Sequence, residues 1–337
     1  MAKRKKVQEP TSADNLNGLR TELRKKFGED TIKVYTEAHN TPTISTGIIT
    51  LDKALGGGFA EGRMTELLGE ASSGKTTIAL SALANAQKKY PDKRAIYVDT
   101  EHALDTVWAA KLGVDLNRLD HVEPEFGEDA IFIMEAYLRT KEVSVLVLDS
   151  AAALLPKAEA DNDIGDANIG LQARLIASAM RRINKLLNKN PHTVVIWINQ
   201  KRARIGGGPA SFAFEPTKST GGKALPFYMT TRISVVKIKA LRDNDRNEYG
   251  QVVVADVLKN KVNNGPGAKV TFQIENAYGI DTPQELLELA QAAGKVEKAG
   301  AWYTFVDEDE KVQGENAAKD IIRTKYLDKW IKELVNG

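Results

Sequence analysis

The sequence contains no cysteine and only four histidines in 337 residues. The absence of cysteine excludes a disulfide framework, and the histidines, at 39, 102, 121 and 192, are scattered without ligand spacing, so no structural zinc site is expected. No apolar run approaches the roughly 18 residues that a membrane span needs, so no membrane partner is expected. The basic start MAKRKK lacks the apolar segment of a secretory signal. These absences predict a cytoplasmic protein.

An excess of charge is also lacking, because 47 lysines and arginines stand against 45 aspartates and glutamates, a formal net charge of +2. Binding to nucleic acid must therefore depend on local patches. One such patch spans residues 201–223, where five basic residues accompany a single glutamate. The hydrophobic content of 42% is that of an ordinary globular protein, and the length allows one large domain and a smaller one.

Short apolar runs alternate with helical patterns from about residue 44 to 275. The runs MTELL, RAIYVD, VSVLVLD and TVVIWIN are separated by helical stretches such as TTIALSALANAQKKY. Apolar strands joined by crossover helices predict an α/β fold with a mostly parallel sheet covered on both faces. Three further runs, at 232–241, 251–260 and 268–275, follow without intervening helices and predict antiparallel hairpins that extend the sheet.

Changes in pattern predict four segments. Residues 1–14 form a basic tail, predicted to be disordered. Residues 15–43 hold a short amphipathic helix that ends at Gly28. It has no partner within its own segment, so we expect it to serve oligomerisation. Residues 44–280 form the core, and residues 281–337 read as helix, small hairpin and two closing helices, a small α+β domain.

The stretch GEASSGKT, Gly69 to Thr76, fits the pattern G-x-x-x-x-G-K-[ST]. In such a loop, glycines let backbone N–H groups approach phosphates, the lysine reaches the β- and γ-phosphates, and the hydroxyl ligates Mg²⁺. The pattern alone also occurs by chance as a turn. Here an apolar strand precedes it and a helical stretch opens at Lys75, so the sequence predicts a site for ATP and Mg²⁺.

Two carboxylates are placed to complete such a site. Asp149 ends the apolar run VSVLVLD and can support the metal ion, although an acid there can also cap the next helix. Glu101, two residues past YVD, is the best-placed acid to orient or deprotonate water. Its alternative is a loop acid near the start of a helix.

The strand TVVIWIN is followed by a stretch without helical or strand periodicity, from Lys201 to about Thr220. Structureless loops longer than about 12–15 residues are uncommon and usually functional or disordered. Basic residues, three consecutive glycines and the rings of Phe212 and Phe214 favour a loop that follows phosphates and stacks on bases. The alternative is that the FAF segment anchors the loop to the core.

Beyond these motifs, the chain resembles the bacterial RecA recombinases from about Phe27 to Leu334. The phosphate-binding pattern at residues 69–76, known as the P-loop, is shared by many unrelated NTPases, whereas EHALD, DSAAALLPKAE and GAWY together are specific to this family. The resemblance implies a RecA-like P-loop NTPase core with an N-terminal helix and a small α+β C-terminal domain. The matching stretches are STGIITLDKALGGG, GEASSGKTT, DTEHALD, KLGVD, LVLDSAAALLPKAE, IGLQAR, WINQ, STGGKALPFY, KNKV and EKAGAWY.

The resemblance assigns roles at the phosphates of ATP. Glu101 would be the catalytic carboxylate, and Asp149 would support Mg²⁺ together with Thr76. Gln200 would sense the γ-phosphate and pass its presence to the loop that follows. The residues that would hold the phosphates are Gly69, Ser72, Ser73, Gly74, Lys75, Thr76 and Thr77.

The resemblance also assigns the adenine and the subunit interface. Asp105 and Trp108 would contact the adenine, with Trp in place of the more usual Tyr; from its pattern alone, Trp108 would be a core residue on a helix face. Lys259 and Lys261 match lysines that reach the ATP of the adjacent subunit, where they stabilise charge on the γ-phosphoryl group. By composition they are an ordinary solvated turn. Phe227 also falls at an interface position.

Two stretches correspond to the DNA-binding loops of the family, residues 157–170 and 201–220. The first is acidic, so Arg174, Arg181 and Arg182 on the following helix would have to attract the phosphates. Their alternative is an exposed helix face. In and around the second loop, the residues implied in DNA contact are Lys201, Arg202, Arg204, Phe212, Phe214, Gly221 and Gly222.

The implied activity is that of a DNA-dependent ATPase that forms a helical filament on single-stranded DNA, pairs it with double-stranded DNA and exchanges strands. Repressor proteins and single-strand-binding protein are further implied partners. Two alternatives remain open, a ring-forming helicase or motor and an ATP-binding DNA filament protein with little turnover. The chain departs from the family at Glu70, Ala71 and Lys223, and it lacks the long acidic C-terminal tail.

Overall fold

The computed structural model describes residues 16–29, 32, 41–160, 170–203, 217–219, 224–243, 245–263 and 265–335. The chain divides into two compact units, residues 1–40 and 41–337. The first unit contains the predicted amphipathic helix, α1 (Leu16–Phe27). It ends where predicted, because Gly28 has a φ of 101° and its N–H bonds to the carbonyl of Arg24. None of the residues of α1 is buried.

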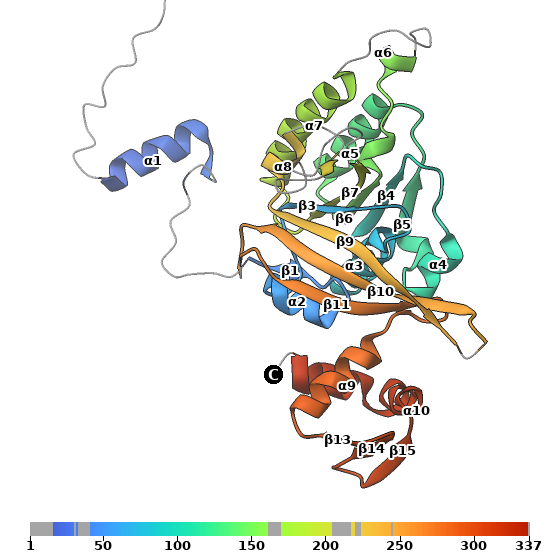
Figure 1. The fold of residues 1–337 in the computed structure, drawn as a ribbon. Coiled ribbons are helices and arrows are strands. Elements are labelled where there is room, and N and C mark those ends of the chain that lie inside the picture. The colour runs from blue at the N-terminus through green and yellow to red at the C-terminus, as the bar shows by residue number, and fades with distance from the viewer. Residues whose placement is uncertain are drawn as a thin grey trace, which may run out of the picture. The chain divides into compact units, whose positions relative to one another are not determined.

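A ten-stranded sheet forms the centre of the second unit, in the order β12-β11-β10-β9-β3-β7-β6-β4-β5, with β8 paired to β7 (Figure 1). The strands from β9 to β5 along this order run parallel, and β9 to β12 pair antiparallel. Both findings confirm the predicted fold class. The strands are β3 (Met64–Gly69), β4 (Arg94–Asp99), β5 (Leu119–Val122), β6 (Val143–Asp149), β7 (Val194–Ala203), β8 (Thr217–Ser219), β9 (Thr231–Arg242), β10 (Glu248–Asn260), β11 (Lys269–Glu275) and β12 (Gly279–Ile280).

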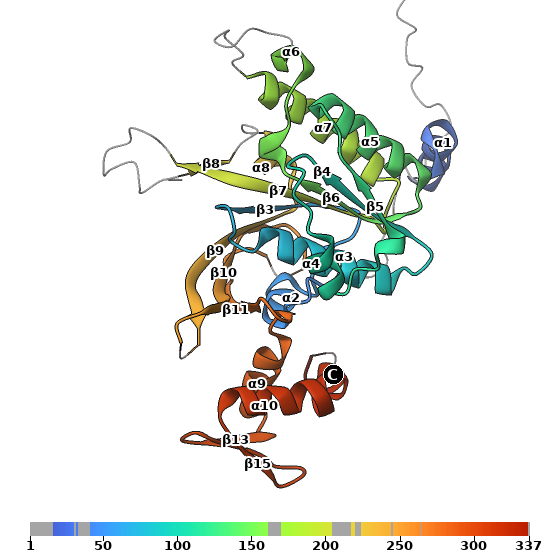
Figure 2. The ribbon, with the colours of Figure 1, turned by 90° about the vertical axis from the view of Figure 1, so that its right-hand side faces the viewer.

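Helices cover both faces of the parallel part of the sheet, with α5 and α7 on one side and α3 on the other (Figure 2). Side chains of β6 alternate between the two resulting cores, since Val145 and Val147 join the core under α3 while Leu146 and Leu148 join the core under α5 and α7. This burial on both faces explains why β6 is apolar at every position from Val145 to Leu148. The helices are α2 (Ile49–Leu55), α3 (Lys75–Lys89), α4 (Thr106–Lys111), α5 (Gly127–Thr140), α6 (Lys157–Ala160), α7 (Leu171–Leu187) and α8 (Ala224–Tyr228), with 3₁₀ turns at Leu116–Arg118 and Ala151–Ala153 and a small sheet of β1 (Thr43–Ile44) and β2 (Phe59–Ala60).

The prediction that strand structure stops before Lys201 is wrong at both ends of the loop. β7 continues to Ala203 and pairs antiparallel with β8, so that Lys201 lies opposite Ser219. Backbone hydrogen bonds hold this ladder, which therefore needs no apolar period in its sequence. The part of the loop between the two strands, residues 204–216, lies outside the described residues, and so do residues 161–169 of the first loop.

The C-terminal residues form a further hydrophobic core, which Ile49 of α2 joins. The rings of Phe305, Tyr326 and Trp330 stack on one another, with centroids of the last two 4.6 Å apart. The predicted closing helices form one continuous helical run from Glu315 to Val335, since no glycine or proline interrupts it. The elements are α9 (Thr282–Ala292), β13 (Val296–Ala299), β14 (Trp302–Phe305), β15 (Glu310–Gln313), α10 (Glu315–Ile321) and α11 (Leu327–Trp330), with π-helical turns at Ile322–Tyr326 and Ile331–Val335. The predicted four-segment division of the chain stays a prediction.

Buried carboxylates fix the start of α2. Glu285 on α9 accepts hydrogen bonds from the backbone N–H groups of Ile49 and Thr50, at 2.9 and 3.0 Å. Asp52 accepts from Ser45 and from both the N–H and the hydroxyl of Thr46. Burial raises the pKa of both carboxyl groups, that of Asp52 to about 7. Carboxyl protonation is therefore coupled to folding here.

Asp52→Asn is expected to flatten the pH dependence of stability. Between pH 3.8 and about 7 the folded state retains a proton that the unfolded state has released, so the free energy of unfolding falls as the pH rises through this window. The shift corresponds to up to about 4 kcal/mol. Asparagine stays neutral, and its amide oxygen and nitrogen can keep the bonds to Thr46 and Ser45.

Urea unfolding of the wild type, Asp52→Asn and the exposed control Asp92→Asn at several pH values measures this effect. We expect the Asp52→Asn variant to gain stability relative to the wild type above pH 7. Parallel pH profiles for all three proteins would show that Asp52 does not titrate in this window.

Candidate active site

The phosphate-binding pattern lies where the sequence predicts, between the end of β3 and the start of α3. A Cβ at Gly69 would lie 2.3 Å from the carbonyl oxygen of Val235, so only glycine fits there. Ser72 and Gly74 have φ values of 56° and 102°, a backbone conformation typical of concave turns that bind anions. The helix N-terminus directly behind the loop adds positive potential. The loop therefore fits a polyphosphate.

Lys75 is 6% exposed, and its Nζ donates to the carbonyl of Glu70 at 2.6 Å and lies 3.5 Å from the hydroxyl of Ser73. Burial lowers the pKa of its ammonium group, although the nearby carboxylates of Asp149 and Glu101 act in the opposite direction. The ammonium group is thus held within the loop itself, where it can meet phosphate oxygens.

Thr76 and Asp149, the two predicted metal-binding residues, lie together. The Thr76 hydroxyl donates to Oδ2 of Asp149 at 2.9 Å. A hydroxyl and a carboxylate at the edge of a phosphate-binding loop are oxygen donors of the kind that Mg²⁺ prefers. The residues present therefore fit Mg²⁺ bound with a nucleotide.

A further contact to Asp149 was not predicted from the sequence. The hydroxyl of Tyr97 on β4 donates to the same carboxylate oxygen at 2.6 Å. Burial raises the pKa of Asp149, while the bonds from Tyr97 and Thr76 lower it. Tyr97 thus helps to keep a buried acid ionised, which favours cation binding.

The structure brings Glu101 and Gln200 into contact across β4 and β7. Gln200 Nε2 donates to Glu101 Oε1 at 2.9 Å, and the Ser150 hydroxyl donates to the same oxygen. The turn that carries Glu101 is held by Asp99, which accepts a hydrogen bond from the backbone N–H of Glu101 at 3.1 Å. Asp99 is buried and also accepts hydrogen bonds from the backbone N–H groups of Ala103 and Leu104, each at 3.0 Å.

Asp105 and Trp108 lie at the start of α4. Asp105 caps this helix by accepting from the N–H of Trp108 at 3.0 Å. The indole N–H of Trp108 donates to the hydroxyl of Thr77 at 3.2 Å, and the ammonium group of Lys111 lies 5.4 Å from its ring. The ring is half-buried and packs against the core under α3, so the indole links the phosphate-binding helix to α4.

Lys259 lies at the end of β10 and Lys261 directly after it. Among the described residues, Lys259 Nζ donates to the carbonyls of Pro226 and Phe227 on α8, at 2.7 and 3.2 Å. Burial, with the positive charges of Lys261 and Arg232, lowers the pKa of Lys259. Phe227 is 72% exposed. Lys259 thus contacts α8, the helix that carries Phe227, and Lys261 lies beside Lys259.

The predicted DNA-contacting residues lie on α7, on β7 or outside the described residues. Arg174 and Arg181 are exposed on α7, whereas Arg182 forms an ion pair with the buried Glu135 of α5 at 2.6 Å. Lys201 donates to the hydroxyl of Ser234 on β9 at 2.6 Å. The backbone of Arg202 lies in β7. The others, which lie outside the described residues, are Arg204, Phe212, Phe214, Gly221 and Gly222.

A buried charged network behind the site was also not predicted. Glu66 on β3 is fully buried, accepts from Asn199 Nδ2 at 2.9 Å and pairs with Arg232 Nε at 2.6 Å. It therefore links three strands: β3, which leads into the phosphate-binding loop, β7, which carries Gln200, and β9, which follows α8. A charged residue in an otherwise apolar run was the only sequence signal for it.

Comparisons with known proteins identify the family of the chain. The protein-family model of the RecA N-terminal domain matches residues 15–281 of the chain. Protein RecA of Desulfotalea psychrophila is 40% identical over 329 residues, which cover 96% of this chain and 90% of the relative. Protein RecA of Nostoc punctiforme is 40% identical over 317 residues (93% and 86%), and that of Mesoplasma florum is 40% identical over 309 residues (90% and 89%). The chain therefore belongs to the RecA family.

Proposed function

We propose that this protein is a DNA-dependent ATPase that forms helical filaments on single-stranded DNA and catalyses homologous pairing and strand exchange. Membership in the RecA family supports a general role in recombination and DNA repair. In the proposed activity, base pairing between the DNA strands recognises homology, whereas the protein holds the strands and controls the timing of the reaction. We place this activity in the cytoplasm. None of the described helices combines the length and the apolar character that a membrane span requires.

The hydrogen bond between Gln200 and Glu101 is the observation that carries this proposal. Gln200 lies on β7, and the same strand continues to Ala203, into the proposed DNA-binding loop of residues 201–220. A change at the γ-phosphate that moves Glu101 would therefore reach the DNA loop through one continuous strand. Such coupling is reciprocal, so DNA binding should in turn stimulate hydrolysis.

The remaining side chains support hydrolysis of ATP. Lys75 and the N–H groups of its loop would hold the phosphates, and Thr76 with Asp149 would hold Mg²⁺, which supplies electrostatic stabilisation of the phosphoryl group when bound. Glu101 would accept a proton from, or orient, the attacking water. Asp105 and Trp108 would bind the adenine.

Exposed apolar groups support self-association. Leu16 and Phe27 of α1 are 63% and 61% exposed, and Phe227 beside Lys259 is 72% exposed. In the filament, Lys259 and Lys261 would reach the ATP of the neighbouring protomer. Repressor proteins and single-strand-binding protein are the further partners that we propose.

Neutralising Arg202 and Arg204 together, each to glutamine, is expected to reduce the salt dependence of binding to single-stranded DNA. Each phosphate contact that is lost lowers the slope of log K against log salt by about 0.7. Fluorescence anisotropy at several salt concentrations measures the slope, with the exposed Lys141→Gln as control. A slope equal to that of the control would mean that these arginines make no phosphate contact.

Strand exchange between single-stranded DNA and a homologous duplex tests the proposed function. We expect exchange that requires ATP and homology. A helicase on the same fold would instead unwind duplexes without needing homology, and a filament protein with little turnover would bind DNA and ATP without DNA-stimulated hydrolysis. Either result would replace the proposal with that alternative.

A further inference from the structure

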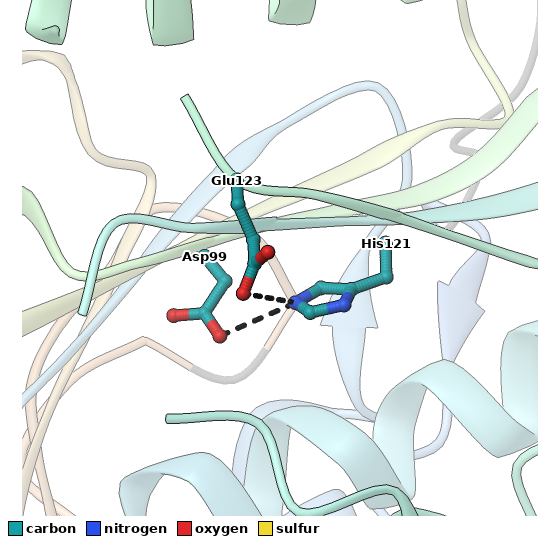
Figure 3. Close-up of side chains that lie close together, drawn as sticks. All are labelled: Asp99, His121 and Glu123. Carbon is teal, nitrogen blue, oxygen red and sulfur yellow. Dashed lines mark hydrogen bonds and ion pairs between the residues drawn. The ribbon is translucent and has the colours of Figure 1, made fainter. Parts of the chain in front are cut away.

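Three side chains with metal-ligating atoms converge beside the turn that carries Glu101. His121 Nε2, near the end of β5, lies 3.3 Å from Oδ2 of Asp99 and 4.0 Å from Oε1 of Glu123 (Figure 3). The three ligand atoms all lie within 4.8 Å of one another. Asp99 is the last residue of β4, whereas His121 lies on β5 and Glu123 follows that strand directly. Two parts of the chain therefore form the cluster.

These separations are close to those of a metal site. Ligand atoms about 2.0–2.1 Å from a tetrahedral Zn²⁺ ion lie about 3.4 Å from one another. The His121–Asp99 distance of 3.3 Å already has this value, the His121–Glu123 distance is 4.0 Å, and the side chain of Glu123 is exposed and so can move towards an ion. The exposed His102 lies 3.5 Å from the same oxygen of Glu123, which places a fourth donor nearby.

We propose that Asp99, His121 and Glu123 bind a divalent transition metal ion, with Zn²⁺ as the preferred ion. One imidazole nitrogen with two carboxylates suits Zn²⁺, whereas Mg²⁺ prefers oxygen ligands alone. The cluster is also distinct in its residues from the Thr76 and Asp149 pair proposed for Mg²⁺. The spacing of histidines along the sequence gave no sign of this site, because neighbouring parallel strands bring Asp99 and His121 together.

The surroundings of the cluster fix the orientation of Asp99. Its Oδ2 accepts hydrogen bonds from the N–H groups of Ala103 and Leu104, both at 3.0 Å, which fix the orientation of the carboxylate. The His121 ring packs against Tyr97, with centroids 6.2 Å apart, so that it too is oriented.

Metal binding here would act on the proposed catalytic turn. Asp99 Oδ1 accepts from the N–H of Glu101, so an ion on Oδ2 of the same carboxylate would fix the turn to β5. The site would thus make the turn that carries Glu101 sensitive to a transition metal ion. The binding itself requires neither ATP nor DNA, so its test is independent of the proposed function.

Titration with Co²⁺, a spectroscopic substitute for Zn²⁺, tests the site in the nucleotide-free protein with millimolar Mg²⁺ present to occupy the all-oxygen site. We expect one Co²⁺ to bind with the visible absorption of a low-coordinate site, and Zn²⁺ to displace it. His121→Asn and the exposed Glu123→Gln should each weaken binding by at least the roughly 10–100-fold that loss of an outer-shell partner causes.

His192→Asn is the matched control, because His192 also lies against a carboxylate, 3.2 Å from Glu61. This variant should bind Co²⁺ as the wild type does. Absence of the absorption in the wild type would mean that His121 only donates a hydrogen bond to Asp99, and equal affinity in the wild type and the Glu123→Gln variant would equally overturn the proposal.

Discussion

Replacing Glu101 with glutamine is expected to lower the rate of DNA-dependent ATP hydrolysis by about 10²–10⁴-fold, the contribution of a positioned general base. Glutamine keeps an oxygen that can accept the hydrogen bonds from Gln200 and Ser150, so the local geometry should survive. Only the basicity is removed. Affinity for ATP should change little, because Lys75 and the glycine loop hold the phosphates.

Single-turnover hydrolysis and binding of a fluorescent ATP analogue measure the two quantities separately. Glu142→Gln is the matched control, since Glu142 is exposed and precedes β6 at the end opposite Asp149. Hydrolysis at the wild-type rate by Glu101→Gln would remove this residue from the proposed mechanism. Loss of ATP binding together with hydrolysis would instead assign Glu101 to the binding of the nucleotide.

Loss of Lys259 and Lys261 is expected to reduce hydrolysis by about 10³-fold or more, the contribution of positive charges supplied in trans to phosphoryl transfer. Within its own chain, Lys259 contacts the carbonyls of α8, and the exposed Lys261 lies beside it. ATP binding by separate protomers should therefore be preserved in Lys259→Ala and Lys261→Ala. The exposed Lys269→Ala, which loses only a surface ion pair with Asp256, is the control.

Mixing two inactive variants tests whether the lysines act across an interface. A mixture of Glu101→Gln with Lys261→Ala protomers forms some interfaces that combine an intact Glu101 with an intact Lys261. If the site is shared, the mixture should hydrolyse ATP faster than either variant alone. A mixture no more active than its components would place both residues in one protomer.

Much of the core was predictable because strands that are buried on both faces have apolar sequences. β6 is buried on both faces and is apolar from Val145 to Leu148, and the pattern at residues 69–76 needs glycine because the backbone of Val235 approaches Gly69 and Gly74 has a positive φ. The short edge strand β5, only partly buried, was not predicted, since its residues LDHV show neither an apolar run nor alternation. β8 was missed for a related reason, because its pairing with β7 is formed by backbone hydrogen bonds, which require no apolar pattern.

The candidate site was predictable where one segment carries its chemistry. Lys75 and Thr76 follow from the loop pattern, and Asp149 follows from its place at the end of a strand. The contacts of Tyr97 with Asp149 and of Glu66 with Arg232 depend on which strands are neighbours. Sheet order is not encoded in any local pattern, so such cross-strand partners become visible only in the folded structure.

Electron microscopy of the protein with single-stranded DNA and a non-hydrolysable ATP analogue tests the central claim most directly. The proposal of a nucleotide site shared between protomers predicts continuous helical filaments on the DNA that are lost when the analogue is omitted or when Lys75 is replaced by alanine. Closed rings or single protomers on the DNA under the same conditions would contradict it.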